Sequence, residues 1–245
     1  MHRIWSLAKR NGKEILREPV SLAFLIGLPV VMEILFYYMF HTLTPQFEMR
    51  YLAPGLIGFA NAFLALFLAI LISMDRESAF ITRIYTTPVR AYEFILGYFL
   101  VAIPLGLCQS AVILLVGGLL ESSFFSWSLL LVLPGSLLSI WMFSAVGILF
   151  GSVFNAKAVG GISSILITGQ SVLSGMWFPL EGLPEGFLTV MGILPFKNIS
   201  LLLQSIATPS SSFEDLWRPF LIVAAYTVAC AALSCVLFIR NSKAK

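Results

Sequence analysis

Long apolar stretches separated by short polar segments make up most of the chain. Six stretches have the roughly 20 mostly apolar residues that an α-helix needs to cross a hydrocarbon core ~30 Å thick. They run over Val20–Thr42, Leu52–Met74, Phe94–Leu120, Ser128–Phe150, Val159–Phe178 and Phe220–Ile239. The stretches are too long and too uniformly apolar for the ~10-residue alternating strands of a membrane β-barrel. The pattern therefore predicts an all-α membrane protein with six transmembrane helices, in one domain over residues 1–245.

The composition supports a bilayer environment and excludes several classes of protein. Apolar residues make up 59% of the 245 residues and charged residues 11%, and the mean hydropathy is +0.95. A soluble enzyme or a disordered chain carries far more charge. The net charge of +3 is too small and too dispersed for a nucleic-acid partner. Cys108, Cys230 and Cys235 lie inside apolar runs, which favours packed thiols over a disulfide or a metal site.

The distribution of Lys and Arg predicts the orientation in the membrane. Twelve of the 15 basic residues lie in the two terminal segments and in the second–third and fourth–fifth connections. Only Arg50, Lys197 and Arg218 lie on the opposite side. This bias predicts a multi-pass protein of the cell membrane with both termini in the cytoplasm.

Residues 1–18 read as an amphipathic helix, with apolar positions at helical spacing and basic residues on the other face. The apolar positions are Ile4, Trp5, Ala8, Ile15 and Leu16. Such a helix suits the cytoplasmic headgroup layer, and Pro19 then breaks it before the first span. The alternative is a charged anchor that merely follows the positive-inside bias.

The connection between the second and third spans carries an apolar stripe within a charged segment. The stripe consists of Phe80, Ile81, Ile84 and Tyr85. Thr87 and Pro88 fit the N-cap and the first residue of a new helix, so a short helix is expected to end near Thr86. This short helix suits a groove on a cytoplasmic partner, and the alternative is that it lies on the membrane surface.

The segment 179–219, between the fifth and sixth spans, is interrupted by four prolines. Its apolar part, Phe187–Leu194, is too short to cross a bilayer. The sequence therefore predicts a re-entrant or interfacial helical hairpin on the outer face, where it would act as a lid or vestibule.

Polar residues inside the spans are candidates for a substrate pathway. Glu33 is the only ionisable residue well inside a span, and Tyr37 and His41 follow it on the same helix face. Glu33 fits a contact for a cationic or hydroxyl-bearing substrate, or a carboxyl that holds helices together. Asn61, Gln109 and Gln170 are weaker candidates for the same two roles.

Small residues recur in the fourth and fifth spans. Gly147 and Gly151 form a small-x-x-x-small pair that favours close helix packing. Gly160, Ser164 and Thr168 have the same four-residue spacing, and Ser171 lies nearby. Close packing is one interpretation of this stripe, and a semi-polar wall of a substrate pathway is the other. The predicted pathway residues are Glu33, Tyr37, Asn61, Thr168 and Ser171.

Motifs for catalysis are not found. The chain has no G-x-x-x-x-G-K-[ST], no H-E-x-x-H and no G-x-S-x-G sequence. We therefore expect a transport protein and no enzyme. An ATP-independent secondary transporter or channel is an alternative, although only Glu33 provides a buried charge. A membrane scaffold that assembles other proteins is a further alternative.

Several features resemble the ABC-2-type transporter permeases in their order and spacing. They are the basic leader, Arg17-Glu18-Pro19, Pro29, Asp75-Arg76-Glu77, Thr87-Pro88, the outward stretch from Ser174 to Pro184, and Ile193-Leu194-Pro195-Phe196. The resemblance covers nearly the whole chain. It implies a membrane subunit of an exporter of drug-, lipid- or glycan-like substrates, working with two separate ATPase subunits and a second permease subunit, identical or a sister. ATP and Mg²⁺ would bind the ATPase subunits, and this chain would hold no cofactor and no metal.

The resemblance also implies roles for particular residues. Residues 75–87 would contain the cytoplasmic coupling helix that docks on the ATPase, and residues 1–18 would be the connecting helix. The docking residues would be Asp75, Arg76, Glu77, Phe80, Ile84, Thr87 and Pro88. The connecting-helix residues would be Arg10, Arg17 and Glu18, and Phe178 and Pro179 would form an exit gate.

Overall fold

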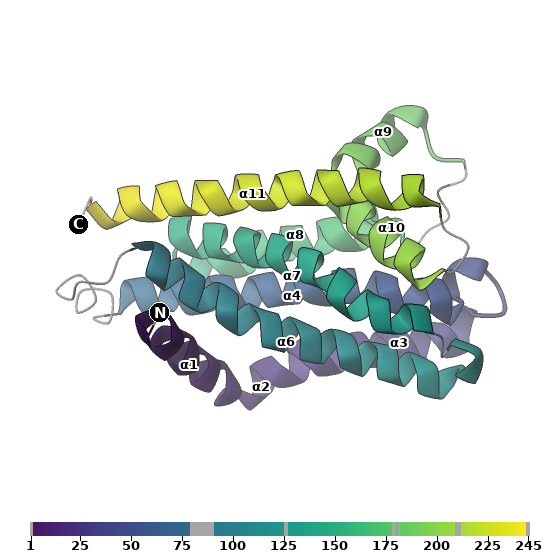
Figure 1. The fold of residues 1–245 in the computed structure, drawn as a ribbon, viewed down its shortest axis with the longest axis horizontal. Helices are drawn as coiled ribbons and strands as arrows, with labels where there is room; N and C mark the ends of the chain where they lie inside the picture. Colours follow the sequence, from purple (N-terminus) through teal and green to yellow (C-terminus); the bar gives the residue numbers. More distant parts are fainter. Residues whose placement is uncertain are drawn as a thin grey trace.

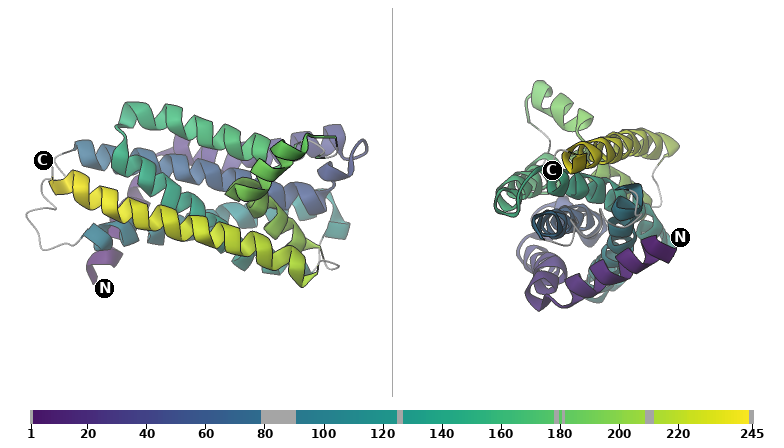
Figure 2. Two further views of the ribbon diagram at one scale, coloured as in Figure 1. Left: turned by 90° about the horizontal axis from the view of Figure 1, so that it is seen from above. Right: turned by 90° about the vertical axis from the view of Figure 1, so that its left-hand side faces the viewer.

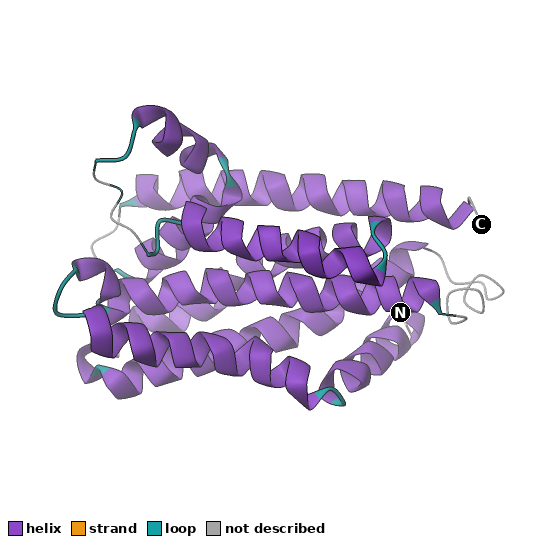
Figure 3. Cartoon of the chain, turned by 180° about the vertical axis from the view of Figure 1, so that it is seen from behind, coloured by secondary structure: helices purple, strands orange, loops and turns teal. Residues whose placement is uncertain are grey.

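The computed structural model describes residues 2–78, 91–124, 127–177, 180, 182–208 and 212–243. The regular structure in these residues is entirely helical (Figure 1 and Figure 3). The elements are α1 (His2–Leu16), α2 (Pro19–Leu22), the π-helical turn η1 (Ala23–Gly27), α3 (Leu28–Phe40), the 3₁₀ turn η2 (Pro45–Phe47), α4 (Met49–Glu77), α6 (Ala91–Leu120), the 3₁₀ turn η3 (Ser122–Phe124), α7 (Trp127–Val153), α8 (Ala156–Leu173), α9 (Glu185–Ile193), α10 (Pro195–Ala207) and α11 (Phe213–Lys243).

The long helices confirm an all-α membrane protein. Within the described residues, five helical segments are long and apolar enough to cross a membrane. They are Pro19–Phe40, Met49–Glu77, Tyr92–Leu120, Trp127–Val153 and Asp215–Leu237. The helix α8 is shorter and more polar; its 18 residues extend about 27 Å. It packs against α4 and α7 and is the sixth long helical segment of the bundle (Figure 2).

The fifth predicted span ends earlier than expected. The sequence pattern extends this span to Phe178, whereas α8 ends at Leu173. Gly175 has a φ of +72°, a left-handed conformation that does not continue an α-helix. Uniform hydropathy therefore placed the end of this helix beyond Leu173 and its start three residues after Ala156.

The first span is bent near its start. Pro19 occupies the first turn of α2, where a proline is tolerated because its missing N–H has no helical partner. Pro29 lacks the N–H that would bond to the carbonyl of Leu25, and η1 covers this turn with the wider spacing of a π-helix. The expected break at Pro19 is confirmed.

The helix α4 forms the centre of the bundle (Figure 2). In the most apolar 18-residue stretch of α4, 78% of the residues are buried, compared with 11% in the corresponding stretch of α11. The fourth span, α7, approaches α4 closely at two glycines. A Cβ on Gly147 would lie 2.5 Å from the carbonyl oxygen of Ala65, and a Cβ on Gly151 would lie 2.7 Å from that of Ala69. The predicted close packing of Gly147 and Gly151 is confirmed, because only glycine leaves room for the α4 backbone.

The segment between α8 and α11 contains a sharply bent helix pair. Helices α9 and α10 meet at 77° around Leu194. The Asn198 side-chain Nδ2 donates to the carbonyls of Gly192 at 2.8 Å and Leu194 at 2.7 Å, and Asn198 is buried. These two hydrogen bonds satisfy carbonyls that the end of α9 leaves unpaired. The bent pair has the form expected of the re-entrant hairpin.

The helix α1 lies crosswise at the end of the bundle that carries both termini, here called the termini end (Figure 1 and Figure 2). It packs against α6 and buries Ala8, Asn11 and Ile15. The approach is close, since a Cβ on Gly97 of α6 would lie 3.0 Å from the Cβ of Leu7. Trp5 and Leu16 are exposed on another face, as an interfacial helix requires.

Candidate functional site

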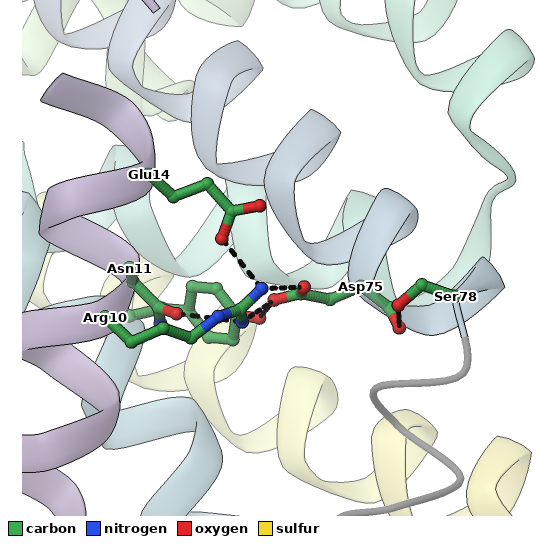
Figure 4. Close-up of polar contacts among 6 residues, drawn as sticks. Arg10, Asn11, Glu14, Asp75 and Ser78 are labelled. Atoms are coloured by element: carbon green, nitrogen blue, oxygen red, sulfur yellow. Dashed lines mark hydrogen bonds and ion pairs between the residues drawn. The ribbon is translucent and has the colours of Figure 1, made fainter. Parts of the chain in front are cut away.

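Three consecutive residues at the end of α4 hold four other helices at the termini end. Asp75 accepts hydrogen bonds from Nη1 and Nη2 of Arg10 on α1, each at 2.6 Å (Figure 4). It also accepts a hydrogen bond from the hydroxyl of Tyr98 on α6. Asp75 is only 3% exposed. A bidentate guanidinium–carboxylate pair fixes both distance and orientation, so it sets the position of α1 relative to α4.

Arg10 has further partners on its own helix. Its Nη2 forms an ion pair with Glu14 at 2.7 Å, and its Nη1 donates to Oδ1 of Asn11 at 3.2 Å (Figure 4). Burial alone lowers the pKa of Arg10, but the hydrogen bond and the charge of Asp75 outweigh it, so the pKa is raised. Burial raises the pKa of Glu14, and the charge of Arg10 opposes this shift only in part. Arg10 therefore stays charged, as its contact with Asp75 requires.

Arg76 and Glu77 bind the turn between α7 and α8. The Nη1 of Arg76 donates to the carbonyls of Gly151 at 2.7 Å and Phe154 at 3.2 Å, at the end of α7. Oε1 of Glu77 accepts from the backbone N–H of Ala156 at 2.9 Å, at the start of α8. A cation at a helix C-terminus and an anion at a helix N-terminus both interact favourably with the helix dipole. We call Arg10, Asp75, Arg76, Glu77 and Tyr98 together the 75–77 junction.

Glu33 is buried between helices. It is 0% exposed, and its Oε1 lies 3.0 Å from the position of a Cβ on Gly117 of α6. Neither carboxyl oxygen has a hydrogen-bond partner among the residues that the structure describes. Tyr37 is half-buried and stacks on His41, with ring centroids 4.4 Å apart. Glu33 and Tyr37 thus share a helix but have no contact through a hydrogen bond in the described residues.

The other polar residues of the spans lie in different surroundings. Asn61 is buried and donates from Nδ2 to the Ser139 hydroxyl at 3.0 Å, which joins α4 to α7. Gln170 is buried, and its Nε2 lies 2.9 Å from the position of a Cβ on Gly58 of α4. Gln109 of α6 is also buried. These side chains lie at helix interfaces.

Helix α8 presents a face that nothing in the described chain covers, where small side chains lie beside Ile165, which is 73% exposed. Gly161, Ser164 and Thr168 are exposed, and a Cβ on Gly160 or Gly161 would meet no atom within 4 Å. The Ser171 hydroxyl, at the end of α8, accepts a hydrogen bond from the indole N–H of Trp177. Within the described chain the stripe on α8 therefore does not mediate helix packing.

The family of the chain follows from a comparison with family models. The model for ABC-2 type transporters matches residues 2–207. The chain belongs to the ABC-2 type transporter family. A comparison with curated proteins finds no match. Membership makes the chain a permease of an ABC-type transporter and a multi-pass membrane protein, and it implies association with an ABC ATPase.

Three of the predicted docking residues of the permease contact other helices of this same chain. Asp75, Arg76 and Glu77 belong to the 75–77 junction, which lies directly before residues 79–90. The other predicted docking residues, Phe80, Ile84, Thr87 and Pro88, lie outside the described residues, as do the exit-gate residues Phe178 and Pro179. Their roles remain predictions.

The predicted connecting-helix residues of the permease divide into two groups. Arg10 points toward Asp75 inside the molecule (Figure 4). Arg17 and Glu18 are exposed, and Oε2 of Glu18 accepts from the Ser21 hydroxyl at 2.9 Å. Of the three predicted connecting-helix residues, Arg17 and Glu18 are therefore the two whose side chains are exposed and accessible to a partner protein.

Sequence reasoning missed Tyr98 and the α7–α8 turn. A tyrosine inside a long apolar span gives no local sign of a partner, and Tyr98 lies 23 residues from Asp75. The turn supplies backbone groups, which carry no residue-type signal at all. Asn155 alone was recognisable, as a helix N-cap whose Oδ1 accepts from the N–H of Ala158.

Proposed function

We propose that this permease exports a drug-, lipid- or glycan-like substrate, driven by ATP that a separate ATPase subunit hydrolyses with Mg²⁺. The observation that carries the proposal is the 75–77 junction. It joins the end of α4 to α1, α6, α7 and α8 immediately before the segment that the family resemblance assigns to ATPase docking.

The junction supports a mechanism in which the ATPase moves several helices together. A displacement applied to residues 79–90 reaches α4 and α6 directly, because these residues connect the end of α4 to the start of α6. The ion pair with Arg10 then carries it to α1, and the contacts of Arg76 and Glu77 carry it to the α7–α8 turn. Rigid-body movement of packed helices is a common form of switching between two conformations. ATP binding drives such a switch only if the docked ATPase favours one conformation over the other.

The substrate pathway is proposed to lie between two permease subunits, with two ATPase subunits bound. The exposed face of α8 supports this arrangement, because Gly161, Ser164 and Thr168 lie there beside the apolar Ile165, whereas the exposed face of α11 carries many large apolar side chains. Phe220, Leu221, Val228, Leu233 and Val236 are large and apolar, and they are exposed on α11. Thr168, and Ser171 at the end of α8, would line the pathway, and the bent α9–α10 pair would cover its outer exit.

Reconstitution tests the proposal. The permease is co-expressed with candidate ABC ATPases and placed in liposomes, and ATP hydrolysis is measured with and without candidate substrates. We expect one ATPase to co-purify with the permease and to hydrolyse ATP faster when substrate is present. Substrate flux through liposomes that contain the permease alone, without nucleotide, would overturn the proposal in favour of a secondary transporter or channel.

A further inference from the structure

A cavity of about 630 Å³ lies between the bent helix pair and the first turns of α11. Asn198, Leu201 and Ser205 line it from α10, at the spacing of one helix face. Asp215, Arg218 and Leu221 line it from α11, also along one face. The elements that line it, α9, α10 and the first turns of α11, lie at the end of the bundle opposite the termini (Figure 1). Its volume is that of a typical small-ligand site.

Two opposite charges face this cavity from neighbouring turns of α11. Asp215 and Arg218 are three residues apart and both are exposed. No salt bridge joins them among the side chains that the structure describes. Asp215 accepts hydrogen bonds from Ser212, and Arg218 lies over the ring of Trp217. The carboxylate and the guanidinium therefore remain able to bind a ligand that carries both charges.

Apolar side chains line the cavity further along the two helices. Helices α10 and α11 pack together and are joined by residues 208–212, so Ser205 and Asp215 lie near the same end. Leu201 and Leu221 lie one to two turns further along their helices, as does Ile222. Trp217 is 41% exposed beside these charges, as is typical of tryptophan at a membrane–water interface. The lining thus changes from charged near residues 208–212 to apolar further along α10 and α11.

We propose that this cavity binds a membrane phospholipid with a zwitterionic, amine-bearing headgroup. The lipid ammonium contacts Asp215, the phosphate contacts Arg218, and an acyl chain follows Leu201 and Leu221. An anionic headgroup without an amine also offers its phosphate to Arg218, but it has no ammonium for Asp215, so that carboxylate gains no cationic partner and adds repulsion. Asn198 also lines the cavity and holds the α9–α10 bend, so the bound lipid braces the bent pair against α11. Binding here requires neither the ATPase nor transport, and it stands apart from the proposed function.

Native mass spectrometry of the full chain in detergent tests this site. The protein is titrated with phosphatidylethanolamine or with phosphatidylglycerol. We expect wild type to retain phosphatidylethanolamine in preference, and Arg218→Gln to lower this retention roughly fivefold to tenfold. Asp215→Asn removes the negative charge, so its preference should shift toward phosphatidylglycerol. Both variants alter exposed side chains, so their unfolding temperatures should match that of wild type, and thermal unfolding checks that the variants fold.

The other charged pair at the same end provides matched controls. Glu48 and Arg50 form a salt bridge of 2.9 Å away from this cavity lining. Glu48→Gln and Arg50→Gln should leave lipid retention and selectivity unchanged. A photoreactive phosphatidylethanolamine should label residues 212–222 in wild type. The proposal is overturned if wild type prefers phosphatidylglycerol, if the site and control variants behave alike, or if cross-linking places a second protein copy in the cavity.

Discussion

Arg10 and Asp75 are 65 residues apart in the chain and are joined by two parallel hydrogen bonds of 2.6 Å. One partner lies on the helix that crosses the end of the bundle, and the other lies at the end of its central helix. The pair therefore fixes α1 to α4 at the place where the chain enters the proposed docking segment.

We expect Asp75→Asn to destabilise the protein. The substitution keeps the shape of the side chain but leaves the Arg10 charge without its carboxylate. Breaking a buried ion pair costs several kcal/mol, and the partial exposure of Arg10 reduces this to about 1–3 kcal/mol. Thermal unfolding in detergent measures the change. Arg17→Ala, at an exposed position directly after α1, is the control, and an equal effect of both substitutions would contradict the role of the pair.

The double substitution Arg76→Ala with Glu77→Ala should weaken coupling while membrane insertion remains intact. It removes the contacts from α4 to the end of α7 and to the start of α8. Substrate-stimulated ATP hydrolysis and transport are measured in liposomes with the partner ATPase. Lys157→Ala, an exposed residue on the first turn of α8, serves as the control. Unchanged coupled activity in the double variant would count against the mechanism.

Gly147→Ala should lower the stability of the bundle, because the new Cβ would lie 2.5 Å from the carbonyl oxygen of Ala65. Overpacking of this kind costs typically about 1–3 kcal/mol. Gly160→Ala is the matched control, since its Cβ would meet nothing within 4 Å in the described chain. Unfolding temperatures in detergent compare the two. If Gly160→Ala instead reduces recovery of a permease dimer, the α8 face is a contact between subunits.

Glu33→Gln separates the two roles considered for this carboxyl. Glu33 is buried, and its oxygens have no partner in the described residues, so we expect it to pack helices. Gln has nearly the same volume, so Glu33→Gln should leave the unfolding temperature unchanged and the transport rate within about twofold of wild type. Glu33→Lys, in contrast, places an unpaired charge in the membrane and should prevent folding. A loss of transport by the Gln variant, with stability unchanged, would show that Glu33 contacts a cationic substrate.

Asn198→Ala should loosen the bent helix pair. It removes both hydrogen bonds from Nδ2 and leaves the carbonyls of Gly192 and Leu194 without this partner. Loss of a buried hydrogen bond costs about 1–3 kcal/mol, so backbone amides of α9 should exchange hydrogen faster. Thr189→Val removes only an exposed bond to Glu185 on the same helix and provides the comparison. Equal exchange in both variants would mean that another contact holds the bend.

The sequence by itself determined the class of the protein, the approximate spans, the break at Pro19 and the presence of a proline-interrupted, non-spanning segment within 179–219. These features depend on local properties. A run of about 20 apolar residues must form a helix to satisfy its backbone in lipid. A proline at a polar boundary between helices favours a break there, as at Pro19, whereas Pro54, Pro104 and Pro134 lie inside continuous helices. The glycine pair on α7 was also readable, because small residues at four-residue spacing form one helix face.

The tertiary structure alone decided what the charged and polar residues do. Asp75, Arg76 and Glu77 are adjacent in sequence, yet successive side chains on a helix diverge by about 100°, so each meets a different neighbour. Their partners lie 23 to 79 residues away, and several are backbone groups. The small-residue stripe on α8 has the same pattern as the stripe on α7, but one face is open and the other is packed. The sequence period identifies a helix face, whereas packing determines what lies against it.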